Sequence, residues 1–345
     1  MTFKTRLLPA AVGALGMALL AGQAAAQEVT FKLHHMLPPV SEAHVHMLVP
    51  WADKVMKESG GRIKIDIYPS MQLGGAPPQL VDQVRDGVVD IIWTLPGYTP
   101  GRFVKTEVFE LPFMHHDTTS TNKALAEFAT RHGDEYNDYH LIALFVHQGQ
   151  VFHSREPVRT VADLKDMKIR TPTRLGGWMI EAMGAVPIGA PVPKIPEMLS
   201  KGVVDAVLIP YEVAVPLKVY ELVKYHTVLD DPNATRPNTS VFMIAMNKAK
   251  YEALPADLKK VIDDNSGMKI ADWLGQVWAD AETPGETKSR ENGEIIVMSA
   301  AETAKLRAMT EQPVIDRWVA DLKDKDIDGQ ALVDEARALI KKYRQ

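Results

Sequence analysis

The feature that most constrains the fold of this chain is an internal repeat. Residues 79–96 read QLVDQVRDGVVDIIWTLP, and residues 194–210 read KIPEMLSKGVVDAVLIP. Each copy is a predicted helix that ends at a glycine, followed by Val-Val-Asp and an apolar strand that ends at proline. Four identical residues could arise by chance, but the agreement of the flanking pattern favours two duplicated α/β lobes.

Strands and helices alternate along the rest of the chain. The hydrophobic pattern predicts strands at 31–36, 62–68, 88–95, 141–152, 167–171 and 241–246, and helices at 45–58, 79–86, 175–183, 257–283 and 330–343. This order predicts mostly parallel sheets with helices on their faces. Ligands of such sheets bind beyond the carboxyl ends of the strands, so residues 93–95 and 208–211 are expected to form facing walls of a cleft between the lobes.

The composition excludes several classes of protein. The 345 residues include no cysteine, 46% are hydrophobic and 24% are charged, so the chain is neither disordered, nor fibrous, nor stabilised by disulfides. The length suits two domains. A net charge of −5 with both signs mixed argues against a nucleic-acid partner and against an integral membrane protein.

The first 26 residues have the pattern of a secretory signal peptide. Lys4 and Arg6 precede an apolar segment at 7–20, and the alanines at 24–26 suit a signal peptidase. A membrane anchor is the alternative, but the apolar segment is shorter than the roughly 20 residues that span a bilayer. We therefore predict cleavage after Ala26 and export of the mature chain to the periplasm.

Common catalytic and cofactor motifs are missing from the sequence. It has no G-x-S-x-G, H-E-x-x-H, G-x-x-x-x-G-K-[ST] or G-x-G-x-x-G pattern. Histidines lie close together at 34–35, at 44 and 46, and at 115–116, but neither adjacent strand residues nor helix residues two apart share a face. We predict no catalytic residue, no metal site and no cofactor.

Two arginines are candidates for binding an anion. Arg170 lies at the carboxyl end of the predicted strand 167–171, beside the predicted cleft, where a planar guanidinium can hold a carboxylate through two parallel hydrogen bonds. A surface arginine paired with an acidic residue is an equally good interpretation of the residue alone. Arg174 carries the same ambiguity with a weaker case.

Seven short motifs occur in a fixed order along the chain: HHMLP at 34–38, YPSMQLG at 68–74, GVVD at 87–90, FELPF at 109–113, DLKDMKIR at 163–170, GVVD at 202–205 and MNK at 246–248. Together they resemble the substrate-binding subunit of tripartite ATP-independent periplasmic (TRAP) transporters, of the DctP type. The resemblance implies a periplasmic binding protein that captures a small organic acid and delivers it to an integral-membrane permease. It also implies that the arginine ending the DLKDMKIR motif, Arg170, forms a salt bridge with the ligand carboxylate.

The resemblance further implies a type II-like fold, with two α/β lobes around a hinged cleft and a long helix crossing both lobes. Lobe one would comprise 27–147 plus 237–275, and lobe two 148–236 plus 276–345. The crossing helix would span 257–290, with a kink or an early end at Pro284-Gly285 because proline removes an intrahelical hydrogen bond. We expect a monomer that closes on its ligand.

Departures from the sialic-acid-binding members of this family suggest the kind of ligand. Those members carry an arginine where Gln150 stands and an asparagine where Ile209 stands. Loss of polar groups disfavours sugar acids, whose hydroxyls would be buried without partners. We predict a monocarboxylate with an aromatic or apolar body. The full set of predicted binding residues is Arg170, Trp93, Leu95, Gln150, Ile209, Tyr211, Glu212, His35 and Arg174.

Each of these residues has a second interpretation. Trp93 and Tyr211, expected to close over the ligand, would otherwise fill the cores of the lobes, while His35, Arg174 or Glu212 would meet a polar substituent. The rival function is a secreted α/β enzyme with Glu212 or a cleft histidine as its base, and a scaffold without a ligand is a third possibility. We favour the binding protein.

Overall fold

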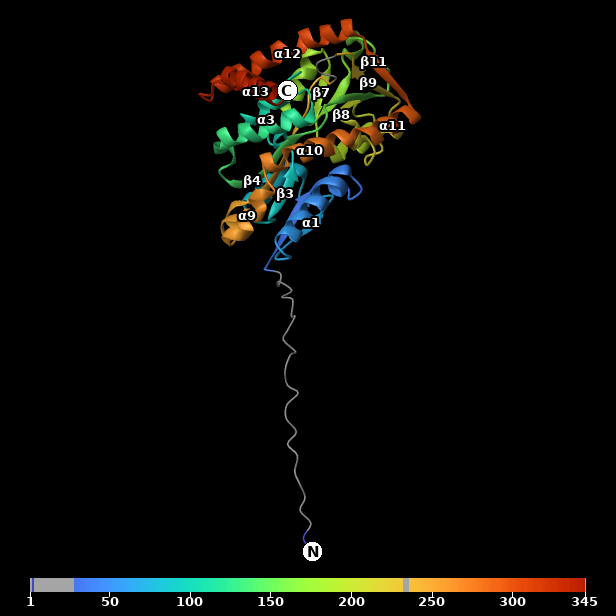
Figure 1. Cartoon of the computed structure of the whole chain (residues 1–345). Coiled ribbons are helices and arrows are strands. Elements are labelled where there is room, and N and C mark those ends of the chain that lie inside the picture. The colour runs from blue at the N-terminus through green and yellow to red at the C-terminus, as the bar shows by residue number, and fades with distance from the viewer. Residues whose placement is uncertain (1, 3–27, 232–235, 345) are drawn as a thin grey trace.

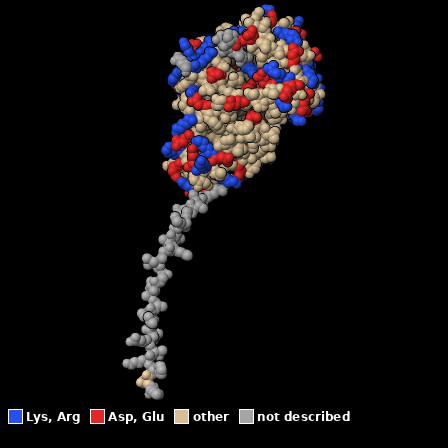
Figure 2. All heavy atoms as spheres, turned by 45° about the vertical axis from the view of Figure 1, so that its right-hand side comes forward, with Lys and Arg blue, Asp and Glu red and all other residues tan. Residues whose placement is uncertain are grey.

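The computed structural model describes residues 2, 28–231 and 236–344. The predicted signal peptide and its cleavage site therefore lie outside the described residues, apart from Thr2. Among the described residues, no helix combines the length and the apolar character needed to cross a membrane. Basic and acidic side chains are intermixed on the face shown in Figure 2.

The strands form two sheets, one in each half of the molecule (Figure 1). The first has the order β2-β1-β3-β10-β4 and contains β1 (Val29–His35), β2 (Ile63–Tyr68), β3 (Ile91–Thr94), β4 (Tyr139–Val146) and β10 (Val241–Asn247). The second has the order β11-β9-β5-β8-β6-β7 and contains β5 (Val151–Ser154), β6 (Lys168–Thr171), β7 (Val186–Gly189), β8 (Ala206–Ile209), β9 (Tyr225–Leu229) and β11 (Glu294–Met298). The prediction of a two-sheet α/β fold is confirmed.

Parallel pairing is interrupted in each sheet by one strand that comes from the other half. β10 runs antiparallel to β3 and β4, and β5 runs antiparallel to β8 and β9, whereas the other pairs are parallel. β5 follows β4 across the boundary between the sheets, and β10 returns across it after β9. A strand that enters from the opposite side reverses the local direction of the sheet.

The sequence repeat corresponds to two equivalent positions in these sheets. β3 lies between parallel β1 and antiparallel β10, and β8 lies between parallel β6 and antiparallel β5. The aspartate of each Val-Val-Asp accepts a hydrogen bond from a backbone N–H of the neighbouring parallel strand: Asp90 from Lys32 at 2.8 Å, and Asp205 from Lys168 at 2.9 Å. In both copies of the repeat, this aspartate therefore links the central strand to its parallel neighbour.

The helices cover the sheets and connect the halves. They are α1 (Val49–Glu58), α2 (Leu80–Arg85), α3 (Thr118–Arg131), α4 (Arg174–Ala182), α5 (Ile195–Ser200), α6 (Tyr211–Ala214), α7 (Val219–Leu222), α8 (Lys248–Glu252), α9 (Ala256–Asp264), α10 (Met268–Asp280), α11 (Glu282–Asn292), α12 (Ala300–Lys323) and α13 (Gly329–Tyr343). A π-helix occupies η1 (Ala43–Leu48), and 3₁₀ turns occupy η2 (Pro77–Gln79), η3 (Pro96–Tyr98), η4 (Thr106–Glu110), η5 (Gly133–Tyr136), η6 (Val161–Leu164) and η7 (Val192–Lys194).

The expected crossing helix is present as consecutive pieces. α10 packs on α3 in the first half, and α11 packs on α6 in the second (Figure 1). The helix is interrupted at Ala281, between α10 and α11. This position is about one turn before Pro284, whose ring would clash with the carbonyl group four residues earlier in a continuous helix. A second break precedes α10 at Gly267, which has a φ of +56°.

The C-terminal segment differs from the expected division into lobes. α12 packs on α4 of the second half, but α13 packs on α3 of the first. Its buried face consists of apolar side chains that include Leu332, Val333 and Ala336. Residues 329–343 therefore attach to the half opposite the one that the sequence suggested.

Candidate ligand-binding site

A cavity lies between the two sheets, at the strand ends where the repeat predicts a cleft. About 370 Å³ of space lies between its wall atoms, part of it continuous with solvent, and about 30 Å³ of this can hold the centre of a water molecule. Its wall consists of Met36, Leu37, Trp93, Leu95, Tyr98, His147, Gln150, Arg170, Pro172, Val192, Ile209, Pro210, Glu212, Val213, Ser240 and Phe242. Both sheets contribute, so movement of one half relative to the other would open the cavity.

Arg170 supplies the positive charge of the cavity. It is the next-to-last residue of β6, and it is 1% exposed. Nε and Nη2 donate to the carbonyl oxygen of Ala190 at 2.8 and 2.6 Å, and Nη1 lies 3.4 Å from the carbonyl oxygen of Leu208. Burial lowers the pKa of the guanidinium, and the neighbouring Tyr98 hydroxyl offsets this only in part. Among the described residues, no carboxylate forms an ion pair with Arg170. A buried guanidinium without a carboxylate partner is suited to bind an anionic ligand.

Tyr98 closes the cavity next to Arg170. It belongs to η3, directly after β3, and its hydroxyl accepts a hydrogen bond from the Val192 N–H of the opposite half at 2.9 Å. Burial raises the pKa of Tyr98, so the phenol remains protonated. Sequence reasoning missed this residue, although its position just beyond the end of a repeated strand was a signal that could have found it.

Aromatic rings form the apolar wall. Trp93 is fully buried, and its ring centroid lies 5.2 Å from that of Phe242 and 5.8 Å from that of His35. Phe242 in turn stacks on Trp278 of α10 at 4.7 Å. Trp93 therefore both belongs to the core of the first half and lines the cavity, which combines the two interpretations of its sequence position.

The segments that cross between the sheets supply a polar patch. Gln150 donates from Nε2 to the Ser240 hydroxyl at 3.0 Å, and its Oε1 has no hydrogen-bond partner among the described residues. His147 accepts the Gly149 N–H at Nδ1 over 2.9 Å, and burial holds the pKa of His147 well below its usual range. His147 and Ser240 were missed because nothing in the sequence links 147–150 to 240, whereas the fold pairs these segments.

Glu212 is the acidic residue of the cavity wall. Its side chain is 2% exposed, and within the described chain its Oε2 lacks a hydrogen-bond partner. Burial, reinforced by the nearby Glu282 carboxylate, raises the pKa of Glu212 well above its usual range. Burial therefore favours the protonated carboxyl group, which can donate a hydrogen bond.

Most of the predicted binding residues line the cavity, namely Arg170, Trp93, Leu95, Gln150, Ile209 and Glu212. Tyr211 and His35 do not. Tyr211 packs in the second half, 5.3 Å from the ring of His153 and beneath Arg236. Because residues along a helix rotate by about 100° each, Glu212 faces the cavity when Tyr211 turns away. His35 Nε2 is hydrogen-bonded to His44 Nδ1 at 2.9 Å, behind Trp93.

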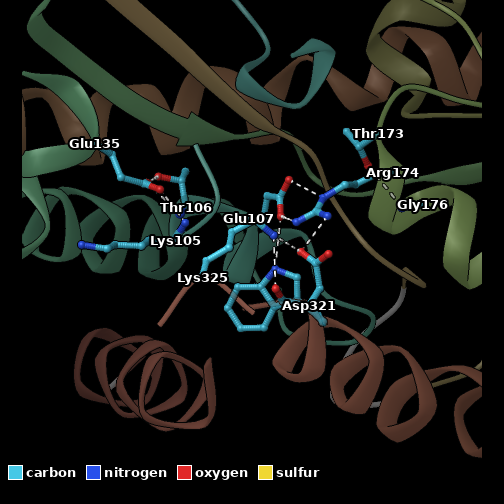
Figure 3. Close-up of polar contacts among 10 residues, drawn as sticks. Lys105, Thr106, Glu107, Glu135, Thr173, Arg174, Gly176, Asp321 and Lys325 are labelled. Carbon is cyan, nitrogen blue, oxygen red and sulfur yellow. Dashed lines mark hydrogen bonds and ion pairs between the residues drawn. The ribbon is translucent and has the colours of Figure 1, made fainter. Parts of the chain in front are cut away.

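Arg174 also lies away from the cavity wall, in an ion-pair network that joins the halves (Figure 3). Its Nε and Nη2 donate to the two carboxylate oxygens of Glu107 at 2.8 and 2.5 Å, and Nη1 donates to Asp321 at 2.9 Å. Trp318 Nε1 donates to Glu107 as well, at 3.2 Å. Arg174 therefore connects α4 to η4 and α12.

Metal-binding groups do not converge in the described part of the chain, where no three His, Cys, Asp or Glu side chains are placed to share an ion. The cavity instead combines one cation, an aromatic wall and a few hydrogen-bonding groups. This arrangement suits a small anionic molecule with an apolar body.

Known proteins resemble the chain over nearly its whole length. A TRAP solute-binding protein from a marine metagenome, specific for aromatic acids and solved with 3-hydroxybenzoate, is 42% identical, with a TM-score of 0.90 over 93% of this chain and 100% of its own. One from Rhodoferax ferrireducens, solved with copurified benzoate, is 44% identical, with a TM-score of 0.89 over 92% and 98%. A protein of Comamonas testosteroni named outer membrane transporter protein TsaT is 27% identical over 98% of both chains.

The family model for bacterial extracellular solute-binding proteins, family 7, matches residues 33–321. The prediction of the family from the seven motifs is confirmed, as is the type II-like fold that the structural relatives share. The cavity between two α/β halves, its buried arginine and these likenesses lead to one conclusion: the chain belongs to the DctP family of TRAP-transporter solute-binding proteins.

Proposed function

We propose that this protein binds a monocarboxylate with an aromatic body and that Arg170 pairs with the carboxylate. The observation that carries the proposal is the charge of Arg170, buried at one end of an apolar cavity and without an acidic partner among the described residues. A carboxylate would supply that partner, and rings of Trp93 and Phe242 would contact an aromatic body. The benzoate and 3-hydroxybenzoate bound by the 42–44% identical relatives support this ligand class.

We further propose that the protein is periplasmic and delivers its ligand to a TRAP permease without chemical change. The signal-peptide pattern and the extracellular family support the location. N-terminal sequencing of protein from a periplasmic extract should begin at Gln27. Recovery of the chain only in the outer-membrane fraction would contradict the proposed location.

The ligand class is tested by identifying what the protein carries. Protein purified from cells supplied with a mixture of acids is denatured, and the released small molecule is identified by mass spectrometry. Thermal-shift measurements on ligand-free protein then compare benzoate with a sialic acid and an uronate. We expect an unchanged aromatic acid to be released and to stabilise the protein. Stabilisation by the sugar acids alone, or conversion of the acid during incubation, would overturn the proposal.

A further inference from the structure

We propose that the cavity has a second, hydroxyl-binding end formed by Gln150 and Glu212, so that hydroxylated aromatic acids bind more tightly than unsubstituted ones. This inference rests on the proposed function, because it assumes that Arg170 holds a carboxylate at the first end. It assigns to the two residues a role in selecting among aromatic acids.

The strand order separates the two ends. In the second sheet, β8 lies between β6, which carries Arg170, and β5, which Gln150 directly precedes. Val151 of β5 is paired with Ile209 at the end of β8, so Gln150 lies at the edge of the sheet that faces the cavity. Neighbouring strands are about 4.8 Å apart, and the register places Gln150 about three residues further along β8 than Arg170, so roughly 14 Å separate the two backbone positions. A single-ring acid with its carboxylate at Arg170 can therefore direct a ring substituent toward Gln150.

Two buried oxygen atoms are free at this second end. Gln150 and Glu212 are each 2% exposed and line the cavity, and Gln150 Oε1 and Glu212 Oε2 have no hydrogen-bond partner among the described residues. The Gln150 amide nitrogen is already engaged by the Ser240 hydroxyl, so the amide offers an acceptor. Buried polar atoms are nearly always hydrogen-bonded in native proteins, and both residues line the cavity, so a ligand bound there can supply the missing partner.

A hydroxyl group matches these two atoms in hydrogen-bonding capacity. It donates one hydrogen bond and accepts others. The Glu212 carboxyl, whose protonated form is favoured by burial, can donate to the hydroxyl oxygen while Gln150 Oε1 accepts a hydrogen bond from the hydroxyl. A second carboxylate would lie beside the Glu212 carboxyl, and a cation would have to share the cavity with Arg170. A neutral hydroxyl is thus the favoured substituent.

An unsubstituted ring would leave both oxygens without partners inside a closed cavity. Because an unsatisfied buried polar group costs more than a hydrogen bond contributes, we expect hydroxybenzoate to bind about 10- to 100-fold more tightly than benzoate. The bound 3-hydroxybenzoate and benzoate of the two relatives show that both kinds of acid enter cavities of this fold.

The experiment is calorimetry on protein freed of copurified ligand by unfolding and refolding. Benzoate, 3-hydroxybenzoate and 4-hydroxybenzoate are titrated into the wild type, Gln150→Met, Glu212→Met and Glu212→Gln. Gln148→Met is the matched control, since this nearby glutamine also has a buried, unpartnered Oε1 but does not line the cavity. Thermal melting verifies that each variant is folded.

We expect the wild type and Gln148→Met to prefer one of the hydroxybenzoates, and Gln150→Met and Glu212→Met to lose most of that preference, measured as the ratio of hydroxybenzoate to benzoate affinity. Glu212→Gln, which keeps a donor, should retain the preference even if Glu212→Met fails to fold. Equal affinity of the wild type for all three acids would overturn the inference and leave the proposed function intact. Failure of the wild type to bind any of them would overturn the proposed function itself. Persistence of the wild-type preference in folded Gln150→Met, or its loss in Gln148→Met, would show that other residues bind the hydroxyl.

Discussion

At the scale of single residues, the environment of Arg170 determines what the cavity can hold. Its hydrogen bonds go to backbone carbonyls of Ala190 and Leu208, which orient the guanidinium without neutralising it. The charge is therefore available to a ligand in a site where water is excluded. A buried charge left in this state costs free energy, and ligand binding relieves that cost.

We predict that Arg170→Ala weakens binding of the aromatic acid about 30- to 4000-fold, because the ligand carboxylate would be buried without a partner. Arg170→Lys should also weaken it strongly, since an ammonium cannot form two parallel hydrogen bonds. Calorimetry measures both, with Arg159→Ala as a control because that arginine is exposed and pairs with Glu294. Unchanged affinity in folded Arg170→Ala would remove this residue from the site.

At the scale of secondary-structure elements, the sequence predicted most strands and helices but not their tertiary neighbours. Alternating and continuous apolar segments predicted the strands of the sheets, and the repeat predicted β3 and β8. These predictions succeeded because each signal is local in sequence. The pairing of 147–150 with 237–240 and the docking of α13 on α3 are contacts between distant segments, which no periodicity encodes. For the same reason the sequence did not identify Ser240 and Phe242 as cavity residues. It also predicted that Tyr211 lines the cavity together with the adjacent Glu212, whereas only Glu212 does.

Gly285 is a glycine whose presence can be explained either by helix breaking or by close packing. The sequence suggested that it breaks a helix, but it lies inside α11, where a Cβ atom would come within 1.9 Å of the Tyr211 carbonyl oxygen. We predict that Gly285→Ala lowers the free energy of unfolding by about 1–3 kcal/mol, because α11 must move away from α6.

Urea unfolding measures this effect, and Gly133→Ala is the matched control, since a Cβ there meets nothing within 4 Å. Equal stability of the two variants would show that α11 and α6 do not pack as closely as described.

At the scale of the whole molecule, contacts between the halves hold the cavity shut. The Tyr98–Val192 hydrogen bond closes it next to Arg170, and the Arg174–Glu107 ion pair fastens α4 to η4. A ligand can favour this closed form only through contacts that an open form lacks. Arg170 and Tyr98 come from opposite halves, so a ligand can contact both of them only when the halves are close together.

We predict that a saturating aromatic acid decreases the radius of gyration measured by small-angle scattering. Tyr98→Phe should lower affinity by about 3- to 10-fold, mainly through faster dissociation, because it removes the acceptor for the Val192 N–H. Arg170→Ala with the same acid serves as the control and should show no contraction. Superimposable wild-type curves with and without ligand would contradict closure.

The stability of the whole protein should depend on pH with opposite slopes on the two sides of about pH 6.5. Burial raises the pKa of Glu110 to about 8, so the folded state holds a proton that the unfolded chain loses above about pH 4.5. Its contribution to stability is therefore lost as the pH rises through 8. Burial lowers the pKa of His35 to about 3 and those of His115 and His226 to about 4, so their contribution is lost as the pH falls below 6.5.

Above pH 6.5 these histidines are neutral in both states, and the carboxyl group dominates. We predict that the free energy of unfolding falls by a few kcal/mol between pH 6.5 and 8.5, as urea unfolding would measure. Glu110→Gln should make this decrease smaller while keeping the acceptor for the Val241 N–H; it should not abolish the decrease, because burial also raises the pKa values of Glu212 and Glu282. The exposed Glu291→Gln should leave the decrease unchanged. A flat wild-type profile over this range would show that Glu110 ionises normally.

The hydrogen bonds between 147–150 and 238–240 have a consequence for how such a protein can acquire new ligands. Those segments are where the chain bends between its halves, and they also carry His147, Gln150 and Ser240 of the cavity wall. Any substitution that alters recognition at this end also alters the resistance of the chain to opening. Ligand selectivity and the flexibility of the chain are therefore coupled in these two segments. Substitutions at Trp93 or Ile209, by contrast, can change which ligand fits the cavity without altering the segments that connect the halves.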